Sequence, residues 1–421
     1  RLETNSRWKV ADMTLCDTTP TTTIAASAKT GHEAVVEQLL ADGFDHMFGN
    51  PGTVEEGFLD ALRLYPQMKY VLTLQESVAV LAADGYARAT GKPALVQIHS
   101  TPGLGNAIGA LYQAYRGHSP LVVIGGDAGI RYQGLDAQMA GDLVAMARPV
   151  TKYATMVQHP SSLLRTLRRA IKIAATAPQG PVYVCLPLDV LDAPTTEVVR
   201  PTSIPSTRVA PEPALVDEAA RALVASATPM IYVGNGVAAS EAQGELARVA
   251  ELLGAEAWDV DGGDVNLRYD HPLYQGATGH MFGAHSKPIL SRGDANLIVG
   301  TYLLPEVFPE TGDVLAPAAT RIPFDLNAYE IAKNHPADLA AVFEPEPALA
   351  ALAQRLEQIV TPVQMKSAHE RTQLLAKRKA EAEQTARDQD EARVLSGGPL
   401  TFAPVAQALA AALPDDAIVF D

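Results

Sequence analysis

Short apolar runs alternate with amphipathic segments from about residue 30 onward. Each run has the length of a buried strand, and the segments between them space their apolar residues as helices do. Strands that alternate with helices predict a parallel sheet covered by helices on both faces. The expected strands are residues 45–48, 70–74, 94–98, 121–124 and 182–186, and the expected helices are 32–40, 54–64, 77–89, 105–115 and 162–175.

The alternation returns after residues 197–213, a segment rich in proline and threonine that is typical of a linker. Three further apolar runs, at 230–233, 296–299 and 321–326, predict a second parallel sheet. We therefore predict an α/β fold with two doubly wound parallel-sheet domains and only the start of a third. The expected parts are a disordered tail (1–29), a first domain (30–196), the linker (197–213), a central domain (214–360), a charged helical connector (361–399), and the opening of a truncated or separate domain (400–421), with a helix at 401–413 and a strand at 417–421.

Polar residues follow three successive strands of the first domain. Residues 50–53 read Asn-Pro-Gly-Thr, Glu76 begins a helix, and His99 ends a strand. The carboxyl ends of parallel strands are where open α/β sheets bind ligands, so these groups are candidates for one site. Other readings stay open at this point: Glu76 as a carboxylate favoured by the helix dipole, His99 as a structural residue, residues 50–53 as a plain turn, and Asn106 as a helix cap.

Composition narrows the choice of partners. The chain has 421 residues, of which 47% are hydrophobic and 19% charged, and its net charge is −15. An acidic balance argues against nucleic acid, which needs a basic face. The two cysteines, Cys16 and Cys185, give no disulfide or metal framework. Without a long apolar run or a signal-peptide core, we expect no membrane partner and a cytoplasmic location.

Four motifs together carry a family resemblance. Residues 48–53 read Phe-Gly-Asn-Pro-Gly-Thr, 74–77 read Leu-Gln-Glu-Ser, 99–106 read His-Ser-Thr-Pro-Gly-Leu-Gly-Asn, and 118–121 read His-Ser-Pro-Leu. In these motifs the chain resembles the N-terminal two-thirds of thiamine-diphosphate-dependent 2-oxo acid decarboxylases and carboligases, the family of benzoylformate decarboxylase and acetolactate synthase. The family order is a pyrimidine-binding domain, a central domain and a pyrophosphate-binding domain.

The resemblance implies a chemistry for these residues. The thiazolium of the cofactor becomes a carbon nucleophile and electron sink. Its aminopyrimidine acts as the base when a carboxylate bonds to the ring nitrogen. Glu76 is the expected carboxylate and His99 the expected proton relay, since histidine titrates near neutral pH. The implied cofactor-binding residues are Asn50, Pro51, Gly52, Glu76, Gly103 and Asn106, and Thr53 is implied to contact the substrate carboxylate.

Two features depart from the family pattern. No histidine follows the strand at 296–299, where benzoylformate decarboxylase has a catalytic one; instead His280 and His285 lie in a stretch similar to acetolactate synthase. We count both as candidate substrate residues, either catalytic replacements or a polar loop. The Gly-Asp-Gly motif that binds Mg²⁺ and the diphosphate is missing, so we expect no metal ligands here. In the family these ligands belong to the third domain. We expect that domain to be cleaved, missing from the sequence or on another chain, or the protein to be a non-catalytic relative.

The sequence leads to two hypotheses. The first is thiamine-diphosphate-dependent, non-oxidative decarboxylation of a 2-oxo acid, or carboligation, with Mg²⁺ as second cofactor. The alternative is a non-catalytic or regulatory subunit whose central domain binds a nucleotide. Gly234 and Gly236 favour FAD only weakly, because the full Gly-x-Gly-x-x-Gly is absent. We also expect a homo-oligomer, a dimer or tetramer, with interface candidates on two apolar helices: Val80, Leu81, Tyr112 and Tyr115.

Overall fold

The computed structural model describes residues 29–421 except 261, 304, 397, 398, 400, 415, 418, 420 and 421. These residues divide into two compact units, one with 29–175 and 180–203, the other with 176–179 and the chain from 204 onward. The tail expected at 1–29 lies outside the described residues, apart from Lys29 in a short strand. Most of the strand expected at 417–421 is also outside them.

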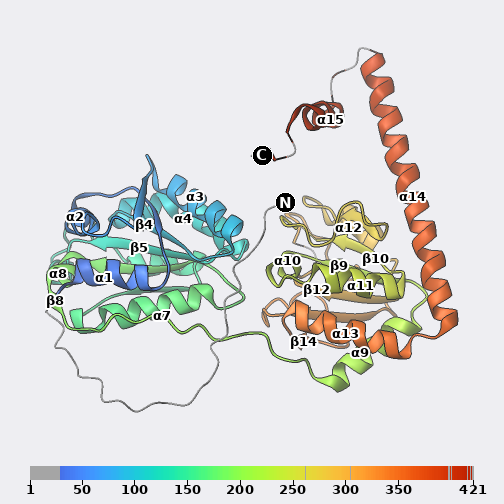
Figure 1. Cartoon of the computed structure of the whole chain (residues 1–421), viewed down its shortest axis with the longest axis horizontal. Coiled ribbons are helices and arrows are strands. Elements are labelled where there is room, and N and C mark those ends of the chain that lie inside the picture. Colours follow the sequence, from blue (N-terminus) through green and yellow to red (C-terminus); the bar gives the residue numbers. More distant parts are fainter. Residues whose placement is uncertain are drawn as a thin grey trace. The chain divides into compact units, whose positions relative to one another are not determined.

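The first unit is a six-stranded parallel sheet in the order β3-β2-β4-β5-β7-β6. Helices α1 and α7 pack over one apolar core, and α3 and α4 pack over another on the opposite face (Figure 1). Helix α2 adds to the first core and α6 to the second. The elements are β1 (Lys29–Thr30), α1 (Gly31–Ala41), β2 (His46–Gly49), the 3₁₀ turn η1 (Thr53–Glu55), α2 (Glu56–Leu62), β3 (Lys69–Leu72), α3 (Glu76–Thr90), β4 (Ala94–Ile98), α4 (Ser100–Arg116), β5 (Leu121–Asp127), α5 (Ile130–Gln133), α6 (Leu143–Ala147), η2 (Arg148–Val150), β6 (Tyr153–Met156), η3 (Pro160–Ser162), α7 (Leu163–Ala175), β7 (Val182–Pro187), α8 (Leu188–Asp192) and β8 (Pro194–Thr195).

The second unit is a six-stranded parallel sheet in the order β11-β10-β9-β12-β13-β14. Helices α9, α11 and α13 supply one core, and α12 supplies Leu290 to a smaller core on the other face. The elements are α9 (Pro213–Ala225), β9 (Pro229–Val233), α10 (Gly236–Ala239), α11 (Gln243–Leu253), β10 (Glu256–Asp259), β11 (Tyr274–Ala277), α12 (Gly283–Leu290), β12 (Ala295–Val299), β13 (Thr320–Asp325), β14 (Ala341–Val342), α13 (Pro345–Ile359), α14 (Pro362–Leu395) and α15 (Phe402–Ala412).

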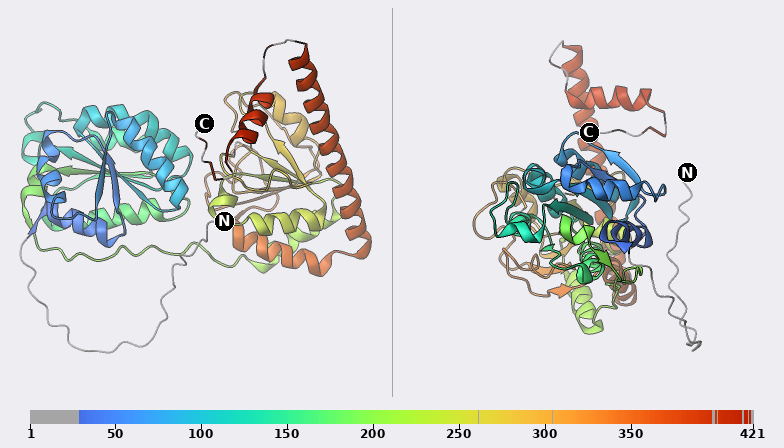
Figure 2. Two further views of the ribbon diagram at one scale, coloured as in Figure 1. Left: turned by 45° about the horizontal axis from the view of Figure 1, so that its top comes forward. Right: turned by 90° about the vertical axis from the view of Figure 1, so that its left-hand side faces the viewer.

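The predicted α/β fold class with two parallel sheets is confirmed, and several details differ. Helix α4 begins at Ser100, five residues before the expected 105–115; Pro102 lies in its first turn, where proline is tolerated. Edge strand β6 was not predicted, since its four residues are only half-buried and form no apolar run. The charged segment expected to be a helical connector is α14, a single long helix (Figure 2).

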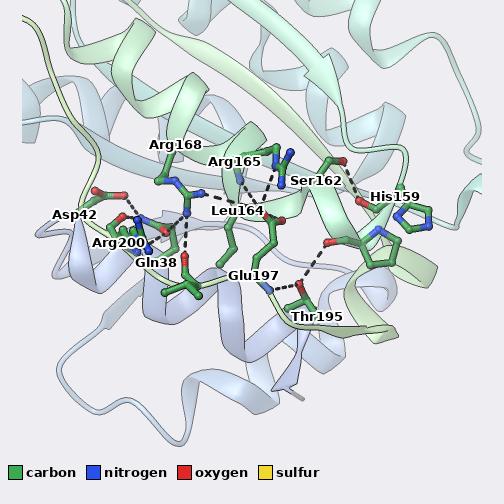
Figure 3. A network of polar contacts seen from close by, with 12 residues as sticks. Gln38, Asp42, His159, Ser162, Leu164, Arg165, Arg168, Thr195, Glu197 and Arg200 are labelled. Atoms are coloured by element: carbon green, nitrogen blue, oxygen red, sulfur yellow. Dashed lines mark hydrogen bonds and ion pairs between the residues drawn. The ribbon is translucent and has the colours of Figure 1, made fainter. Parts of the chain in front are cut away.

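The segment that leaves the first unit is held by a buried glutamine of α1. Gln38 donates from Nε2 to the carbonyl of Arg200 at 2.7 Å and accepts at Oε1 from Arg168 Nη1 at 2.8 Å (Figure 3). Nearby, Asp42 accepts from the backbone N–H of Thr202 at 2.5 Å. Because Gln38 is fully buried, these bonds fix the start of the proline-rich segment on α1 and α7.

Glu197 supplies a second attachment for the same segment. Its carboxylate accepts the backbone N–H groups of Leu164 at 2.8 Å and Arg165 at 3.2 Å, in the first turn of α7. A carboxylate at a helix N-terminus satisfies unpaired amides and interacts favourably with the helix dipole. The first unit therefore extends through Ser203, and residues 204–212 connect it to α9.

Candidate functional site

Three loops meet at the carboxyl edge of the first sheet. They follow β2, β3 and β4, and β2 lies between the other two strands. The chain runs from β2 to β3 on one side and returns to β4 on the other, so the strand order reverses at β2. Ligands of open α/β sheets bind at such a switch point, and residues 50–53, Glu76 and His99 all follow these strands.

Glu76 is a buried carboxylate held by two amides. It is the first residue of α3 and is 6% exposed. Its Oε1 accepts a hydrogen bond from Asn50 Nδ2 at 3.1 Å, and its Oε2 accepts one from Asn106 Nδ2 at 3.0 Å. Asn50 follows β2 and Asn106 lies in α4, so three segments fix the carboxylate. Each oxygen keeps one further acceptor position for a ligand.

Helix α4 places two more predicted residues against this carboxylate. Gly103 lies in its first turn, where a Cβ would stand 3.0 Å from Glu76 Oε1, so the missing side chain leaves room for the acid. The alternative reading of Asn106 as a helix cap was wrong, because Asn106 lies within α4 and His99 is the N-cap residue. Ser100 beside it has a φ of +46°, an uncommon conformation for a residue with a side chain.

His99 is paired with Glu55, a residue that the sequence reasoning missed. The His99 Nδ1 and Glu55 Oε2 atoms are 2.7 Å apart. Glu55 is 4% exposed and also accepts the backbone N–H groups of Gly52 at 2.9 Å and Gly126 at 3.1 Å. Burial raises the pKa of Glu55, while hydrogen bonding to Gly52 and the charge of His99 act in the opposite direction. With Nδ1 directed at the carboxylate, Nε2 is the ring nitrogen left for a ligand.

Two glycines make room for this pair. A Cβ on Gly52 would overlap the ring of His99, and a Cβ on Gly126 would overlap Glu55 Oε1. Glycine is needed at position 52 for lack of space and not for its backbone conformation, because any residue can adopt its φ of −131°. The glycine of the Asn-Pro-Gly-Thr turn therefore lets the backbone lie against the imidazole.

The remaining candidate substrate residues are exposed. Thr53 begins η1 at the surface of the first unit. His280 and His285 belong to the second unit, where His285 lies in α12 and meets the ring of Phe282 edge-on at 6.0 Å. The structure brings Asn50, Gly52, Gly103 and Asn106 together around Glu76 and His99.

The glycine turn of the second unit does not fit the pyrophosphate of a dinucleotide. The sheet has the strand order of dinucleotide-binding folds, but Gly234 N–H donates to Val299 O at 3.3 Å and Gly236 N–H to Gly300 O at 3.1 Å. A phosphate would need those amides. Asp325, the acid at the end of β13, accepts a hydrogen bond from the backbone N–H of Asn327 at 2.6 Å, and burial raises its pKa to about 6.

The described residues contain neither a cluster of metal-ligating side chains nor a membrane-spanning helix. Within these residues, no group of three or more His, Cys, Asp or Glu side chains is arranged to hold a metal ion. None of the described helices is both long enough and apolar enough to cross a membrane.

Comparison with known proteins identifies the family of the chain. Residues 29–146 match the family model "Thiamine pyrophosphate enzyme, N-terminal TPP binding domain", and residues 216–352 match "Thiamine pyrophosphate enzyme, central domain". The chain belongs to the thiamine pyrophosphate enzyme family. The predicted resemblance is confirmed, and Glu76, His99 and the glycine turn all lie in the N-terminal TPP binding domain of this family.

Relatives within the family have different activities. The chain is 31% identical over 320 residues to a probable acetolactate synthase large subunit of Methanocaldococcus jannaschii, covering 74% of this chain and 54% of the relative. It is 35% identical over 234 residues to benzoylformate decarboxylase of Pseudomonas aeruginosa, covering 55% and 44%. Among solved structures, the thiamine diphosphate-dependent 4-hydroxybenzoylformate decarboxylase of Rhodococcus jostii superposes with a TM-score of 0.71 at 28% identity, covering 79% of this chain and 63% of that one. The chain thus spans about half the length of the acetolactate synthase subunit and of the benzoylformate decarboxylase.

Proposed function

We propose that this protein takes part in the thiamine-diphosphate-dependent, non-oxidative decarboxylation of a 2-oxo acid, or in the carboligation that follows from it. The observation that carries the proposal is the buried carboxylate of Glu76, held by Asn50 and Asn106 at the switch point of a TPP binding domain. Burying a carboxylate that has two amide donors and no cation costs free energy, which favours a functional over a structural role for Glu76, and a ring nitrogen is a suitable partner for it.

The residues around Glu76 fit an aminopyrimidine ring. When bound, thiamine diphosphate supplies the carbon nucleophile and the electron sink of the reaction. Glu76 would hold a proton at the ring nitrogen through one of its unused acceptor positions. Pro51, Gly52 and Gly103 would form the walls, since all three are small or rigid where the ring would approach. Thr53 would contact the substrate carboxylate from the exposed end of the turn.

His99 would transfer a proton through Nε2 to or from the reacting substrate, with Glu55 holding the ring in place. We expect His99→Ala to lower kcat more than it raises KM, because a proton relay contributes mainly in the transition state, typically by 10²–10⁴-fold. Steady-state kinetics on the preferred 2-oxo acid would measure both constants. The exposed His159 gives a matched control as His159→Ala, with both constants near wild type. If only KM rises in His99→Ala, His99 binds substrate and relays no proton.

The reaction type can be decided with a substrate panel. Pyruvate, benzoylformate and 4-hydroxybenzoylformate would be assayed with thiamine diphosphate and Mg²⁺ in the presence of a pyrophosphate-binding domain, on the same chain or a second one, and EDTA would test the metal. An aldehyde product identifies a decarboxylase, and a hydroxyketone or hydroxy-oxo acid identifies a carboligase. The competing hypothesis of a regulatory subunit predicts no product from any 2-oxo acid, even when a pyrophosphate-binding domain is supplied.

We propose a homo-oligomer, with a dimer as the smallest unit. Val80 was a wrong interface candidate, because it is fully buried in the core beneath α3. Leu81 is 50% exposed and Tyr112 is 49% exposed on the neighbouring helices α3 and α4. Light scattering at micromolar concentration should give at least twice the chain mass, and Leu81→Glu with Tyr112→Glu should lower it. A monomer mass for the unmodified protein would contradict the proposal.

A further inference from the structure

The helix that carries Glu76 has a glutamine as its cap. Gln75 is the N-cap residue of α3, with an extended backbone, and Glu76 is the first residue of the helix itself. Gln75 Oε1 accepts the backbone N–H of Ser77 at 2.7 Å and that of Val78 at 3.3 Å, and it also accepts the hydroxyl of Ser77. Serine, threonine, aspartate and asparagine ordinarily serve these two amides, and glutamine is not among the preferred capping residues.

The turn between β3 and this cap is fixed as well. The hydroxyl of Thr73, a residue that is 8% exposed, lies 3.2 Å from the carbonyl oxygens of Gly49 and Gln75. The backbone N–H of Thr73 donates to the same Gly49 carbonyl at 2.8 Å. Gln75 is therefore held at its carbonyl by the turn and at its side chain by the first turn of α3, which fixes the backbone of the next residue, Glu76.

The Glu76 carboxylate depends on this backbone position. Its two oxygens meet the amides of Asn50 and Asn106, at 3.1 and 3.0 Å, from two other segments of the unit. A small rotation of the first turn of α3 would weaken both bonds together, because bonds of this length tolerate little displacement. Both partners are neutral, so neither would offset a further negative charge placed beside Glu76.

An acidic residue would also cap this helix. A carboxylate accepts the same amides and interacts favourably with the helix dipole. Asp142 caps α6 of the same unit in this way, accepting the backbone N–H of Ala145 at 2.9 Å. At position 75 a carboxylate would put a like charge on the residue next to Glu76, which disfavours two ionised acids. The amide oxygen of Gln75 caps α3 without that charge.

We propose that Gln75 is a positioning residue for Glu76. Its side-chain oxygen fixes the first turn of α3, so that the Glu76 carboxylate stays between Asn50 and Asn106, and its neutrality keeps a second negative charge away from that carboxylate. The catalytic meaning of Gln75 rests on the proposed function, whereas its placing of the Glu76 carboxylate does not.

The first test follows the position of the Glu76 carboxylate without turnover. The side-chain amide signals of Asn50 and Asn106 in ¹⁵N–¹H NMR spectra depend on their bonds to Glu76, and Asn50→Ala and Asn106→Ala assign these signals. Gln75→Ala removes the cap and should shift both signals. Gln75→Ser restores a neutral cap and should return both signals to their wild-type positions.

The matched control for this test is Thr30→Ala. Thr30 is the N-cap residue of α1 in the same unit, and its hydroxyl oxygen accepts the backbone N–H of Glu33 at 3.3 Å. Loss of either cap should lower the urea concentration at the midpoint of unfolding by a similar amount. Only Gln75→Ala should shift the Asn50 and Asn106 signals.

The second test separates capping from charge, with a pyrophosphate-binding domain supplied. Gln75→Glu keeps an oxygen for the same amides, so its urea midpoint should equal or exceed that of the wild type. Its extra charge should still reduce kcat on the preferred 2-oxo acid by about tenfold, with KM changed by less than about twofold. Gln75→Ser should keep kcat within about threefold of the wild type. A residue that only stabilised α3 would leave Gln75→Glu at least as active as Gln75→Ser.

Three results would overturn the proposal. They are unchanged Asn50 and Asn106 signals in Gln75→Ala, equal shifts of these signals in Thr30→Ala, and wild-type kcat in Gln75→Glu. If Gln75→Ala does not fold, Gln75→Met takes its place, since methionine keeps the length of the side chain and lacks the oxygen. If the unmodified protein turns over no 2-oxo acid, the proposed function is rejected, and the amide signals still decide whether Gln75 positions Glu76.

Discussion

Glu76→Gln is expected to reduce turnover of the preferred 2-oxo acid by about 10²–10⁴-fold, the usual contribution of a group that holds or moves a proton. Glutamine keeps the length of the side chain and removes its charge. It also turns one acceptor into a donor that faces the amide of Asn50 or Asn106, which costs on the order of 1 kcal/mol of stability. The fold should therefore survive while the chemistry does not.

The measurement is kcat at saturating thiamine diphosphate, with circular dichroism to confirm folding. Glu56→Gln is the matched control, because Glu56 is also the first residue of a helix in the same unit but is exposed. The control should retain turnover within about twofold, as surface substitutions have small effects. Near-wild-type kcat in Glu76→Gln would mean that this carboxylate does not bind the cofactor ring, and the proposed function would lose its main support.

Residues at strand ends could be predicted from the sequence because parallel strands have a simple signature. An apolar run followed by a polar residue marks the carboxyl edge of the sheet, and this rule located Asn50, Glu76 and His99 without a structure. The exposure of Leu81 and Tyr112 could also be predicted from the sequence. The prediction that Val80 is exposed was wrong, because adjacent positions on a helix face different sides.

Glu55 could not be found in the same way. An acid three residues after a turn looks like an ordinary helix-capping carboxylate, and it does accept the Gly52 N–H. Its contacts with His99 and Gly126 depend on β4 and β5 being brought beside the turn, which only the folded chain shows. The signal that was available is the Gly-x-x-Glu spacing immediately after a strand, combined with a histidine at the end of the next-but-one strand.

The sequence pattern also failed to predict short or half-buried strands. β10 has four residues with alternating burial, and β14 has two. Their sequences contain too few apolar residues to stand out from loops. Pairing with β9 and β13 fixes their place in the sheet. These strands therefore depend on tertiary contacts that the local sequence pattern does not reveal.

A second large effect is expected from substituting Gly52, which packs against the ring of His99. Alanine is allowed by the backbone angles there, so the penalty comes only from a Cβ that overlaps the imidazole of His99. The ring cannot yield easily, because Glu55 holds its Nδ1 at 2.7 Å and its side chain is only 19% exposed. We expect Gly52→Ala to lower the free energy of unfolding by about 1–3 kcal/mol, as overpacking does, and to reduce kcat at least about tenfold.

A double-mutant cycle identifies the cause of the Gly52→Ala effect. In a His99→Ala background the overlapping ring is gone, so Gly52→Ala should then be nearly neutral for stability, which gives a coupling energy close to the single-mutant cost. Gly85→Ala is the matched control: Gly85 lies within α3 with no atom within 4 Å of an added Cβ, and alanine there should stabilise by about 0.5–1 kcal/mol. Chemical denaturation of the four variants measures both quantities. If Gly52→Ala is equally costly without the His99 ring, the turn itself requires glycine, and the backbone does not lie against the imidazole as the structure has it.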